Sequence, residues 1–467
     1  MITIIKQKKF QFELEENDIL LTNNLNHPFV QTMNNVLNHF LEEKTKEDFT
    51  VIHTLGKIKA KKVYVINMDA LTSEDKRNDL YKKIAEIKSN VCLLLDTFAT
   101  TESDTIIESL FEAIVTKNYY FEQYKSKKES TAKNFYFYSE ADYDSQVSKG
   151  TIYGEAMNHA KDLTNAPNNH LNALSLAKDA LLLEKYSNIL VKIIEKPEIE
   201  KMNMGLFLGV NKGSLDEPKL IFIKYQGLGS FENPVALVGK GVMYDTGGYS
   251  LKTPQSMPGM KGDMAGAAAV IGAIEAIAKL KLKVNVMGII AATDNRIGEN
   301  AIVPDDILTS AKGLTVEIIS TDAEGRLTLA DALWFAQKEG AKEIIDVATL
   351  TGSIVAALGD EFTGAFTNNR KLYKELKAAS LKSFEPLWEM PITKGYHKEL
   401  KSDVADLRNS GTTRNGGSCV AAAFLEEFIE KGTSWIHLDI AATSSTKNQA
   451  TGVMVKTFTE FFIQRNI

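Results

Sequence analysis

Short apolar runs alternate along the chain with stretches in which apolar residues recur at helical spacing. In the first third of the chain, this pattern predicts strands at residues 63–67 and 91–96 and helices at residues 73–88 and 101–116. Strands that alternate with helices favour a parallel sheet with helices packed against its faces. The pattern therefore predicts a small α/β domain with a largely parallel sheet, which we place at residues 1–143.

The next segment predicts a helix that joins two parts of the chain. Apolar residues recur at helical spacing through residues 144–164, and the turn sequence Asn165-Ala-Pro-Asn-Asn discourages further helix. The alternation then returns, with strands predicted at residues 234–238, 284–292, 315–320 and 344–347 and helices at residues 264–279 and 325–338. We therefore predict a linker helix at residues 144–164 and a larger α/β domain at residues 165–467.

Size and composition narrow the class of protein. The chain has 467 residues, which is too long for one compact core and agrees with two domains. Only two cysteines are present, so a disulfide framework is not expected. No apolar stretch reaches the roughly 20 residues that cross a membrane, and the first residues do not resemble a signal peptide. We therefore expect a cytoplasmic protein with no membrane partner.

Acidic and basic side chains gather in two glycine-bearing segments that follow predicted strands. Lys240 and Asp245 follow one strand, and Asp322 and Glu324 follow another. Ligands collect beyond the carboxyl ends of strands in open α/β sheets, so we expect the two segments to meet. Oxygen ligands suit hard divalent cations, and carboxylates can bridge a pair of them. This pattern suggests a two-metal hydrolase.

Each of these residues also has an ordinary structural explanation. Thr321 and Glu324 fit a helix capping box. Asp263 suits the positive end of a helix dipole, and Asp245 before two glycines fits a turn. These explanations do not account for the glycines on both sides of Lys240, which let another group approach the backbone closely. They also leave several buried carboxylates without a neutralising partner, whereas a pair of cations would neutralise these charges. We therefore favour the metal site.

Longer segments carry a recognisable pattern. Residues 239–241 read Gly-Lys-Gly, residues 245–248 read Asp-Thr-Gly-Gly, and residues 320–327 read Ser-Thr-Asp-Ala-Glu-Gly-Arg-Leu. Further matching segments lie at residues 346–352, 401–407 and 435–441. From about residue 162 to its end, the chain resembles the leucyl aminopeptidase family, also called peptidase family M17. The family's octapeptide begins with Asn where this chain has Ser320, and its loop at residues 294–306 also differs.

The resemblance implies a fold, an activity and an assembly. It implies a smaller N-terminal α/β domain joined by a helix to a larger catalytic domain, whose mixed, mostly parallel central sheet is flanked by helices. It implies a dinuclear metallo-aminopeptidase that removes the N-terminal residue, leucine-like or otherwise apolar, from peptides through a two-metal-activated hydroxide. The partners would be peptides with a free N-terminus, and the assembly would be a homohexamer in the cytoplasm.

The resemblance also assigns the metal ligands. Asp245 and Glu324 would bridge two divalent ions. Lys240, as a neutral amine, and Asp263 would complete one site, and Asp322 would complete the other. The ions would be Zn²⁺ or Mn²⁺, with Mg²⁺ or Co²⁺ as alternatives, because ligand chemistry alone does not choose among them.

Catalytic and pocket residues follow from the same resemblance. Lys252 would be a catalytic cation, and Arg326 would act in catalysis by holding a bicarbonate ion. The residues that would line the pocket for the first side chain of the substrate are Met260, Thr349, Gly352 and Ala441.

Other classes of function stay as alternatives. No histidines stand at His-Glu-x-x-His spacing, which excludes a thermolysin-like zinc site. A two-metal phosphoesterase is a second candidate, although its ligand sets usually include histidine. A binding or regulatory protein is a third. The net charge of −6 weighs against a nucleic-acid partner, because duplex binding draws on clustered basic residues.

Overall fold

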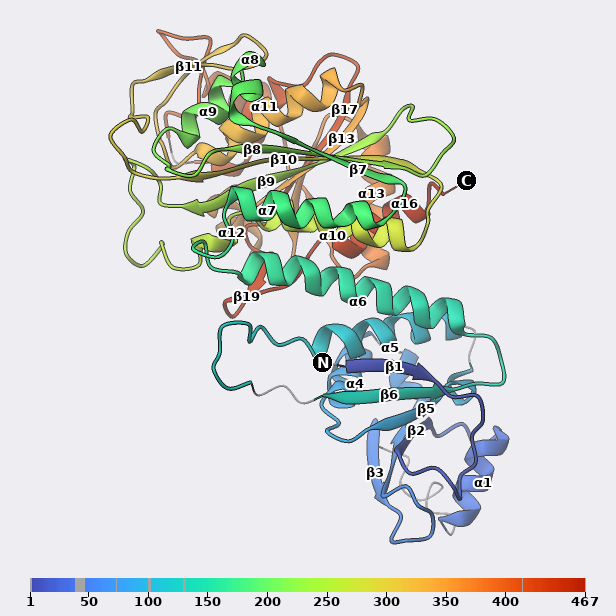
Figure 1. The fold of residues 1–467 in the computed structure, drawn as a ribbon. Coiled ribbons are helices and arrows are strands. Elements are labelled where there is room, and N and C mark those ends of the chain that lie inside the picture. The colour runs from blue at the N-terminus through green and yellow to red at the C-terminus, as the bar shows by residue number, and fades with distance from the viewer. Residues whose placement is uncertain are drawn as a thin grey trace. The chain divides into compact units, whose positions relative to one another are not determined.

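The computed structural model describes residues 2–37, 47–72, 74–99, 102–128, 132–413 and 415–466. The chain divides into two compact units, Met1–Asn158 and His159–Ile467. The division falls within the long helix α6 (Asp144–Asn165), shown in Figure 1. Both units combine a sheet with helices, and the predicted α/β fold class is confirmed.

The first unit is built on a six-stranded sheet in the order β1-β6-β5-β2-β4-β3. Its strands are β1 (Ile2–Lys6), β2 (Asp18–Thr22), β3 (Phe49–His53), β4 (Lys62–Ile66), β5 (Val91–Leu94) and β6 (Lys133–Tyr138). All neighbouring strands are parallel except β3, which runs antiparallel to β4. The helices are α1 (Pro28–Val36), α3 (Met68–Thr72), α4 (Glu74–Ala85) and α5 (Ser103–Lys117). Helix α4 matches the helix predicted at 73–88, of which residue 73 lies outside the described residues.

The sheet of the first unit is buried on both faces. Along β2, Leu20 packs into one apolar cluster, whereas Ile19 and Leu21 pack into another. Successive side chains of a strand point to opposite faces, so the two clusters lie on the two sides of the sheet. The continuous apolar runs of β4 and β5 allowed these two strands to be predicted from the sequence, whereas β2 was not predicted.

The second unit is built on an eight-stranded sheet in the order β15-β14-β17-β13-β9-β10-β8-β7. Its strands are β7 (Ile189–Ile194), β8 (Lys219–Gln226), β9 (Val235–Asp245), β10 (Asn285–Asn295), β13 (Glu343–Ala348), β14 (Thr363–Thr367), β15 (Leu387–Glu389) and β17 (Ser434–Asp439). The central strands β17, β13, β9 and β10 are parallel, and so are β14 and β15. Strand β14 pairs antiparallel with β17, and β8 pairs antiparallel with both β10 and β7. The sheet is therefore mixed and mostly parallel, as predicted.

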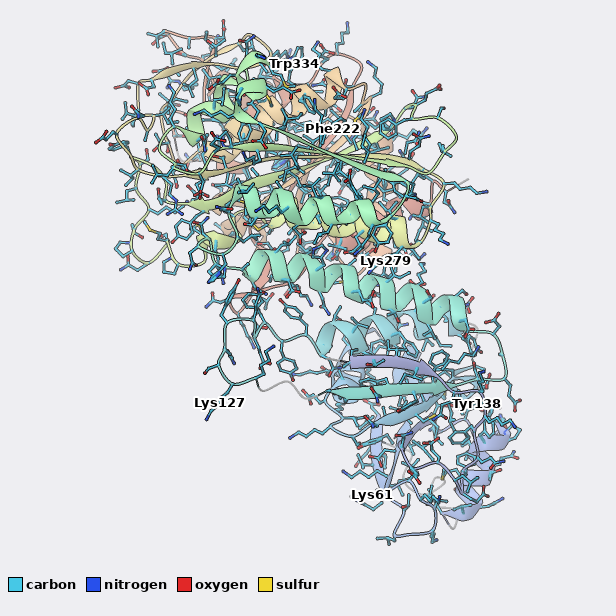
Figure 2. All side chains as sticks on the ribbon, in the orientation of Figure 1. Lys61, Lys127, Tyr138, Phe222, Lys279 and Trp334 are labelled. Carbon is cyan, nitrogen blue, oxygen red and sulfur yellow. The ribbon has the colours of Figure 1, made fainter. Side chains whose placement is uncertain are left out.

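Helices cover both faces of this sheet. Helices α9 (Gly205–Asn211) and α11 (Glu324–Lys338) lie on one face, and α7 (Ala173–Leu181) and α10 (Ala265–Lys279) lie on the other (Figure 1). In Figure 2, Phe222 marks the layer between the sheet and α11, where its ring packs edge-on against Phe335 with centroids 5.3 Å apart. The other helices are α8 (Lys196–Lys201), α12 (Gly352–Leu358), α13 (Arg370–Lys382), α14 (Lys394–Lys398), α15 (Gly417–Glu426) and α16 (Val455–Ile463).

The strand predicted at residues 315–320 lies outside the central sheet. The run at 315–320 contains β12 (Thr315–Glu317), which belongs to a separate three-stranded sheet with β11 (Ile307–Thr309) and β16 (Leu407–Arg408). The expectation that this strand lies in the central sheet is wrong. Only its middle residue, Val316, is buried, so it lacks the two buried faces of a central strand.

Two helices of the second unit are capped by carboxylates from elsewhere in the chain. The side chain of Asp331 accepts hydrogen bonds from the backbone N–H groups of Leu206 and Phe207 at the start of α9, both at 3.0 Å. Glu385 accepts from the N–H of Met454 at 3.1 Å, at the start of α16. Neither helix has a side-chain cap from its own N-cap residue, so these two carboxylates satisfy N–H groups left free by the helix.

Candidate metal centre

Strand β9 carries two of the predicted ligands, Lys240 and Asp245, although their spacing would separate them on a regular strand. Residues five positions apart point to opposite faces, because side chains alternate along a strand. Between Val242 and Asp245, however, β9 advances three residues while β10 advances only two, from Thr293 to Asn295. This β-bulge turns Asp245 to the face that carries Lys240.

The amine of Lys240 lies between two carboxylates. Its Nζ lies 2.7 Å from Oδ1 of Asp263, which follows the short helix η3 (Met260–Gly262), and 2.9 Å from Oε1 of Glu324, the first residue of α11. The amine also donates to the carbonyl oxygen of Thr349, directly after β13, at 2.9 Å. The hydroxyl of Thr349 donates in turn to Asp263 Oδ1 at 2.8 Å. Four segments of the chain therefore meet at one side chain.

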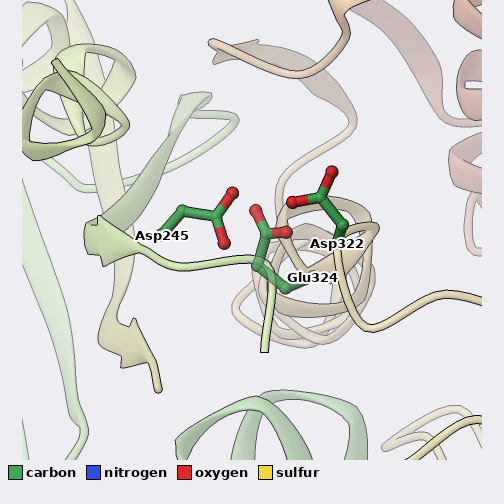
Figure 3. Close-up of side chains that lie close together, drawn as sticks. All are labelled: Asp245, Asp322 and Glu324. Carbon is green, nitrogen blue, oxygen red and sulfur yellow. The ribbon is translucent and has the colours of Figure 1, made fainter. Parts of the chain in front are cut away.

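A second lysine joins the remaining carboxylates. Lys252 Nζ lies 2.7 Å from Oδ2 of Asp245 and 2.6 Å from Oδ1 of Asp322. Oxygen atoms of Asp245, Asp322 and Glu324 all lie within 4.8 Å of one another. Figure 3 shows these three carboxylates close together, with Glu324 between the other two. The side chains expected to bind cations thus converge.

The chemistry of this cluster fits divalent cations. Its four carboxylates outnumber the two ammonium groups that contact them. Among the described residues, the buried Oε2 of Glu324 has no hydrogen-bond partner. A buried carboxylate oxygen without a donor is costly, and a hard divalent cation is a partner that such oxygens suit. The cluster therefore has both the ligand atoms and the excess negative charge that cations require.

Burial and mutual charge shift the pKa values at this centre. Burial raises the pKa of Asp263 well above its ordinary value and the pKa of Asp245 to about 6. Burial alone would lower the pKa of Lys240, but the surrounding carboxylates raise it above its ordinary value. The amine therefore keeps its proton among these carboxylates, and a cation that binds its Nζ must displace that proton.

Glycines allow the close approaches that the centre requires. A Cβ added to Gly325 would lie only 2.4 Å from Cε of Lys240. Gly247 has φ +84°, and a Cβ there would lie 2.8 Å from Oδ1 of Asp322. The absence of a Cβ at these glycines therefore lets charged side chains lie close to the backbone. A turn or a helix cap alone would not require such close contact.

The predicted metal, catalytic and pocket residues all line one cavity of about 990 Å³ in the second unit. Its size is typical of a ligand pocket. The cavity is lined by the metal-ligand candidates, by Lys252 and Arg326, and by Met260, Thr349, Gly352 and Ala441. Arg326 donates from Nη1 to the carbonyl oxygen of Asn409 at 2.8 Å, and its buried Nε has no hydrogen-bond partner among the described residues.

A sequence model of the cytosol aminopeptidase family, catalytic domain, matches residues 158–459. The chain belongs to this family. The solved structure of a tomato leucine aminopeptidase mutant is similar, with a TM-score of 0.86 and 28% sequence identity, over 99% of this chain and 97% of that one. The family predicted from the motifs is confirmed, and membership supports an aminopeptidase whose buried acidic cluster can bind metal.

Within the described part of the chain, no helix is both long enough and apolar enough to cross a bilayer.

The capping explanation for Thr321 is wrong. Helix α11 begins after Ala323 without a side-chain cap. Instead, the buried hydroxyl of Thr321 donates to the carbonyl oxygen of Gly247 at 2.6 Å and accepts from the N–H of Ser250 at 2.7 Å. Thr321 therefore joins the segment between Asp245 and Lys252 to the segment before α11, which carries Asp322.

Sequence reasoning missed Asn295, the last residue of β10. Its Nδ2 donates to Oδ1 of Asp245 at 2.8 Å, so it touches a predicted metal ligand directly. One available signal was its place at the carboxyl end of a buried central strand, where ligand-binding residues of such sheets collect. The signal was weak, because a single asparagine after an apolar run is also ordinary turn chemistry.

Proposed function

We propose that the chain is a dinuclear metallo-aminopeptidase that hydrolyses the N-terminal residue of peptides, with a preference for leucine-like or other apolar residues. The observation that carries this proposal is the convergence of four carboxylates and two lysines from separate segments in one cavity. Membership of the cytosol aminopeptidase family supports the same conclusion.

The proposed ligands divide into two sites. Asp245 and Glu324 would bridge two divalent ions, because their oxygen atoms lie within 4.8 Å of one another. Lys240 and Asp263 would complete one site, and Asp322 would complete the other. The ions would be Zn²⁺ or Mn²⁺, with Mg²⁺ or Co²⁺ as alternatives. When bound, such a pair of ions activates water for hydrolysis near neutral pH.

Lys252 is proposed as the catalytic cation. Burial alone would lower its pKa, but Asp245 and Asp322 raise it above the ordinary value, so the side chain carries a positive charge at neutral pH. Its Nζ is held by these two carboxylates, and all three residues line the cavity. A positive charge fixed in advance stabilises the carbonyl oxygen of the substrate as that oxygen becomes negative.

Arg326 is proposed to hold a bicarbonate ion. Its side chain lines the cavity, its buried Nε has no hydrogen-bond partner in the described part of the chain, and a guanidinium group pairs well with planar oxyanions. Burial lowers the pKa of Arg326 to about 10, which still leaves it charged at neutral pH. Bound bicarbonate would supply a group that accepts and returns a proton.

The pocket and the partners complete the proposal. Met260, Thr349, Gly352 and Ala441 would surround the first side chain of a peptide with a free N-terminus. The homohexamer rests on the family resemblance, and the cytoplasmic location rests on that resemblance and on composition.

Hydrolysis of a panel of amino-acid amides tests the proposed function. We expect release of the amino acid, fastest for leucine and methionine amides, with loss of activity in chelator and recovery with Mn²⁺ or Zn²⁺. Glu324→Gln should lose both metal binding and hydrolysis. The control is Glu339→Gln at the other end of α11, where Glu339 pairs with Lys224 at 3.8 Å on the surface. Full turnover by Glu324→Gln with metal still bound would refute the proposal, and cleavage of phosphoesters alone would favour a phosphoesterase.

A further inference from the structure

Asn295 links the two segments that carry the proposed metal ligands. Its Nδ2 donates to Oδ1 of Asp245 at 2.8 Å and to the carbonyl oxygen of Thr321, directly before Asp322, at 2.9 Å. The backbone of Asn295 is held as well, because its carbonyl oxygen accepts from the N–H of Thr246 at 3.1 Å and from the hydroxyl of Thr246 at 2.8 Å. Asn295 is thus held through both its side chain and its backbone.

A carboxamide is the side chain that meets these requirements. Its NH₂ group has two hydrogens, and each of the two acceptors takes one. Aspartate at this position would bring another negative charge and offer Asp245 no donor when ionised, and serine would offer a single hydrogen. Asn295 is only 2% exposed, so water does not readily replace a lost donor.

The hydrogen bond from Asn295 also orients the carboxylate of Asp245. Oδ1 of Asp245 accepts from Asn295 and from the N–H of Gly247, both at 2.8 Å. This leaves Oδ2 to face Lys252 at 2.7 Å. One oxygen of the carboxylate is therefore held by the protein, and the rotation of the group is set.

We propose that Asn295 is a positioning residue for the metal centre. It sets the separation and orientation of Asp245 on β9 relative to the segment that carries Asp322 and Glu324. The inference rests on the proposed function, because it takes these carboxylates to be metal ligands. It assigns Asn295 no contact with substrate.

Mn²⁺ binding to the full-length protein, measured by calorimetry and equilibrium dialysis, tests this role. Asn295→Ala should raise the Kd for Mn²⁺ by roughly 10–100-fold, the usual effect of removing a group that holds a metal ligand. Asn295→Ser, which keeps one hydrogen-bond donor, should also raise the Kd for Mn²⁺. This variant replaces the alanine variant in the test if Asn295→Ala does not fold.

The same strand offers a matched control. Asn285, the first residue of β10, is also buried, and its Nδ2 also donates to two acceptors, the carbonyl oxygens of Ser230 at 2.7 Å and Glu232 at 3.0 Å. Asn285→Ala and Asn295→Ala each remove a buried carboxamide and should both lower the thermal midpoint of the metal-free protein. Only Asn295→Ala should change the Kd for Mn²⁺. If Asn295 merely stabilised the fold, its loss would lower the thermal midpoint without changing this Kd.

The outcomes separate this inference from the proposed function. If the wild-type protein binds no Mn²⁺ and no other divalent ion, the proposed function fails and the inference fails with it. If the wild type binds Mn²⁺ and the folded Asn295 variants bind it with a Kd within about twofold, only the positioning role is refuted. Equal weakening by Asn285→Ala would also overturn the role, because the effect would then be general.

Discussion

Replacing Gly325 with alanine would disturb the amine of Lys240 with little change elsewhere. A Cβ at Gly325 would lie 2.4 Å from Cε and 2.7 Å from Nζ of Lys240, whereas ordinary contacts begin at 3.4 Å. The end of the lysine side chain must therefore move by about 1 Å, and a displacement of about 1 Å near reacting groups can cost about 10²-fold in rate. We expect kcat to fall by about 10²-fold and Mn²⁺ affinity to fall with it.

The same substitution should leave the fold nearly intact. The clashing atoms belong to the far end of a flexible side chain and not to the backbone. Alanine in a helix is favoured over glycine by roughly 1 kcal/mol, which offsets part of the lost packing of Lys240. The thermal midpoint should therefore change by only about 2–4 °C. Gly229→Ala is the control, because a Cβ at Gly229 would have no atom within 4 Å.

Two measurements decide the outcome for Gly325→Ala. Steady-state hydrolysis of leucine amide at saturating Mn²⁺ gives kcat, and calorimetric titration gives the metal affinity. Wild-type values for both would refute the reasoning that the missing Cβ makes room for Lys240. An unfolded variant, seen by circular dichroism, would refute the claim that the lysine side chain alone yields.

Four further predictions concern charge, metal and pH. Lys252→Ala should slow amide hydrolysis by about 10²-fold or more, while dialysis shows metal still bound. Chelator should abolish hydrolysis, and added Mn²⁺ or Zn²⁺ should restore it. Asp331→Asn should lower the free energy of unfolding by roughly 1–3 kcal/mol in urea titrations. Both carboxylate oxygens of Asp331 accept hydrogen bonds from backbone N–H groups, and asparagine would replace one of these oxygens with an NH₂ group that cannot accept. Burial raises the folded-state pKa of Asp331 and Glu385 to about 7, so between about pH 4 and 7 the folded state binds more protons than the unfolded state. The free energy of unfolding that these two groups contribute should therefore fall as the pH rises through this window. Urea titrations across this pH range should show a smaller fall for Asp331→Asn than for the wild type.

Much of the fold and the ligand set could be predicted because the signals are local. Continuous apolar runs such as those in β4, β5, β9 and β10 mark strands buried on both faces, and their alternation with helices indicates an α/β fold. Glu324, Gly325 and Arg326 stand together in the sequence, so their motif can be recognised without any knowledge of tertiary contacts.

The remaining features depend on distant pairing. The bulge that turns Asp245 toward Lys240 exists only in the register between β9 and β10, which no single segment reveals. Thr321 fits a helix cap in isolation, yet its partners are Gly247 and Ser250, more than 70 residues earlier. Asn295 lies at the start of the loop that departs from the family pattern, and its contact with Asp245 spans 50 positions.

The bulge in β9 makes the number of residues between Lys240 and Asp245 as important as their identity. A gene that lost one codon between residues 242 and 245 could still encode a paired strand, but that acid would turn to the opposite side of the sheet. Exchange of Met243 or Tyr244 for another amino acid would leave this count unchanged. Evolution and engineering alike are therefore more constrained here in length than in composition.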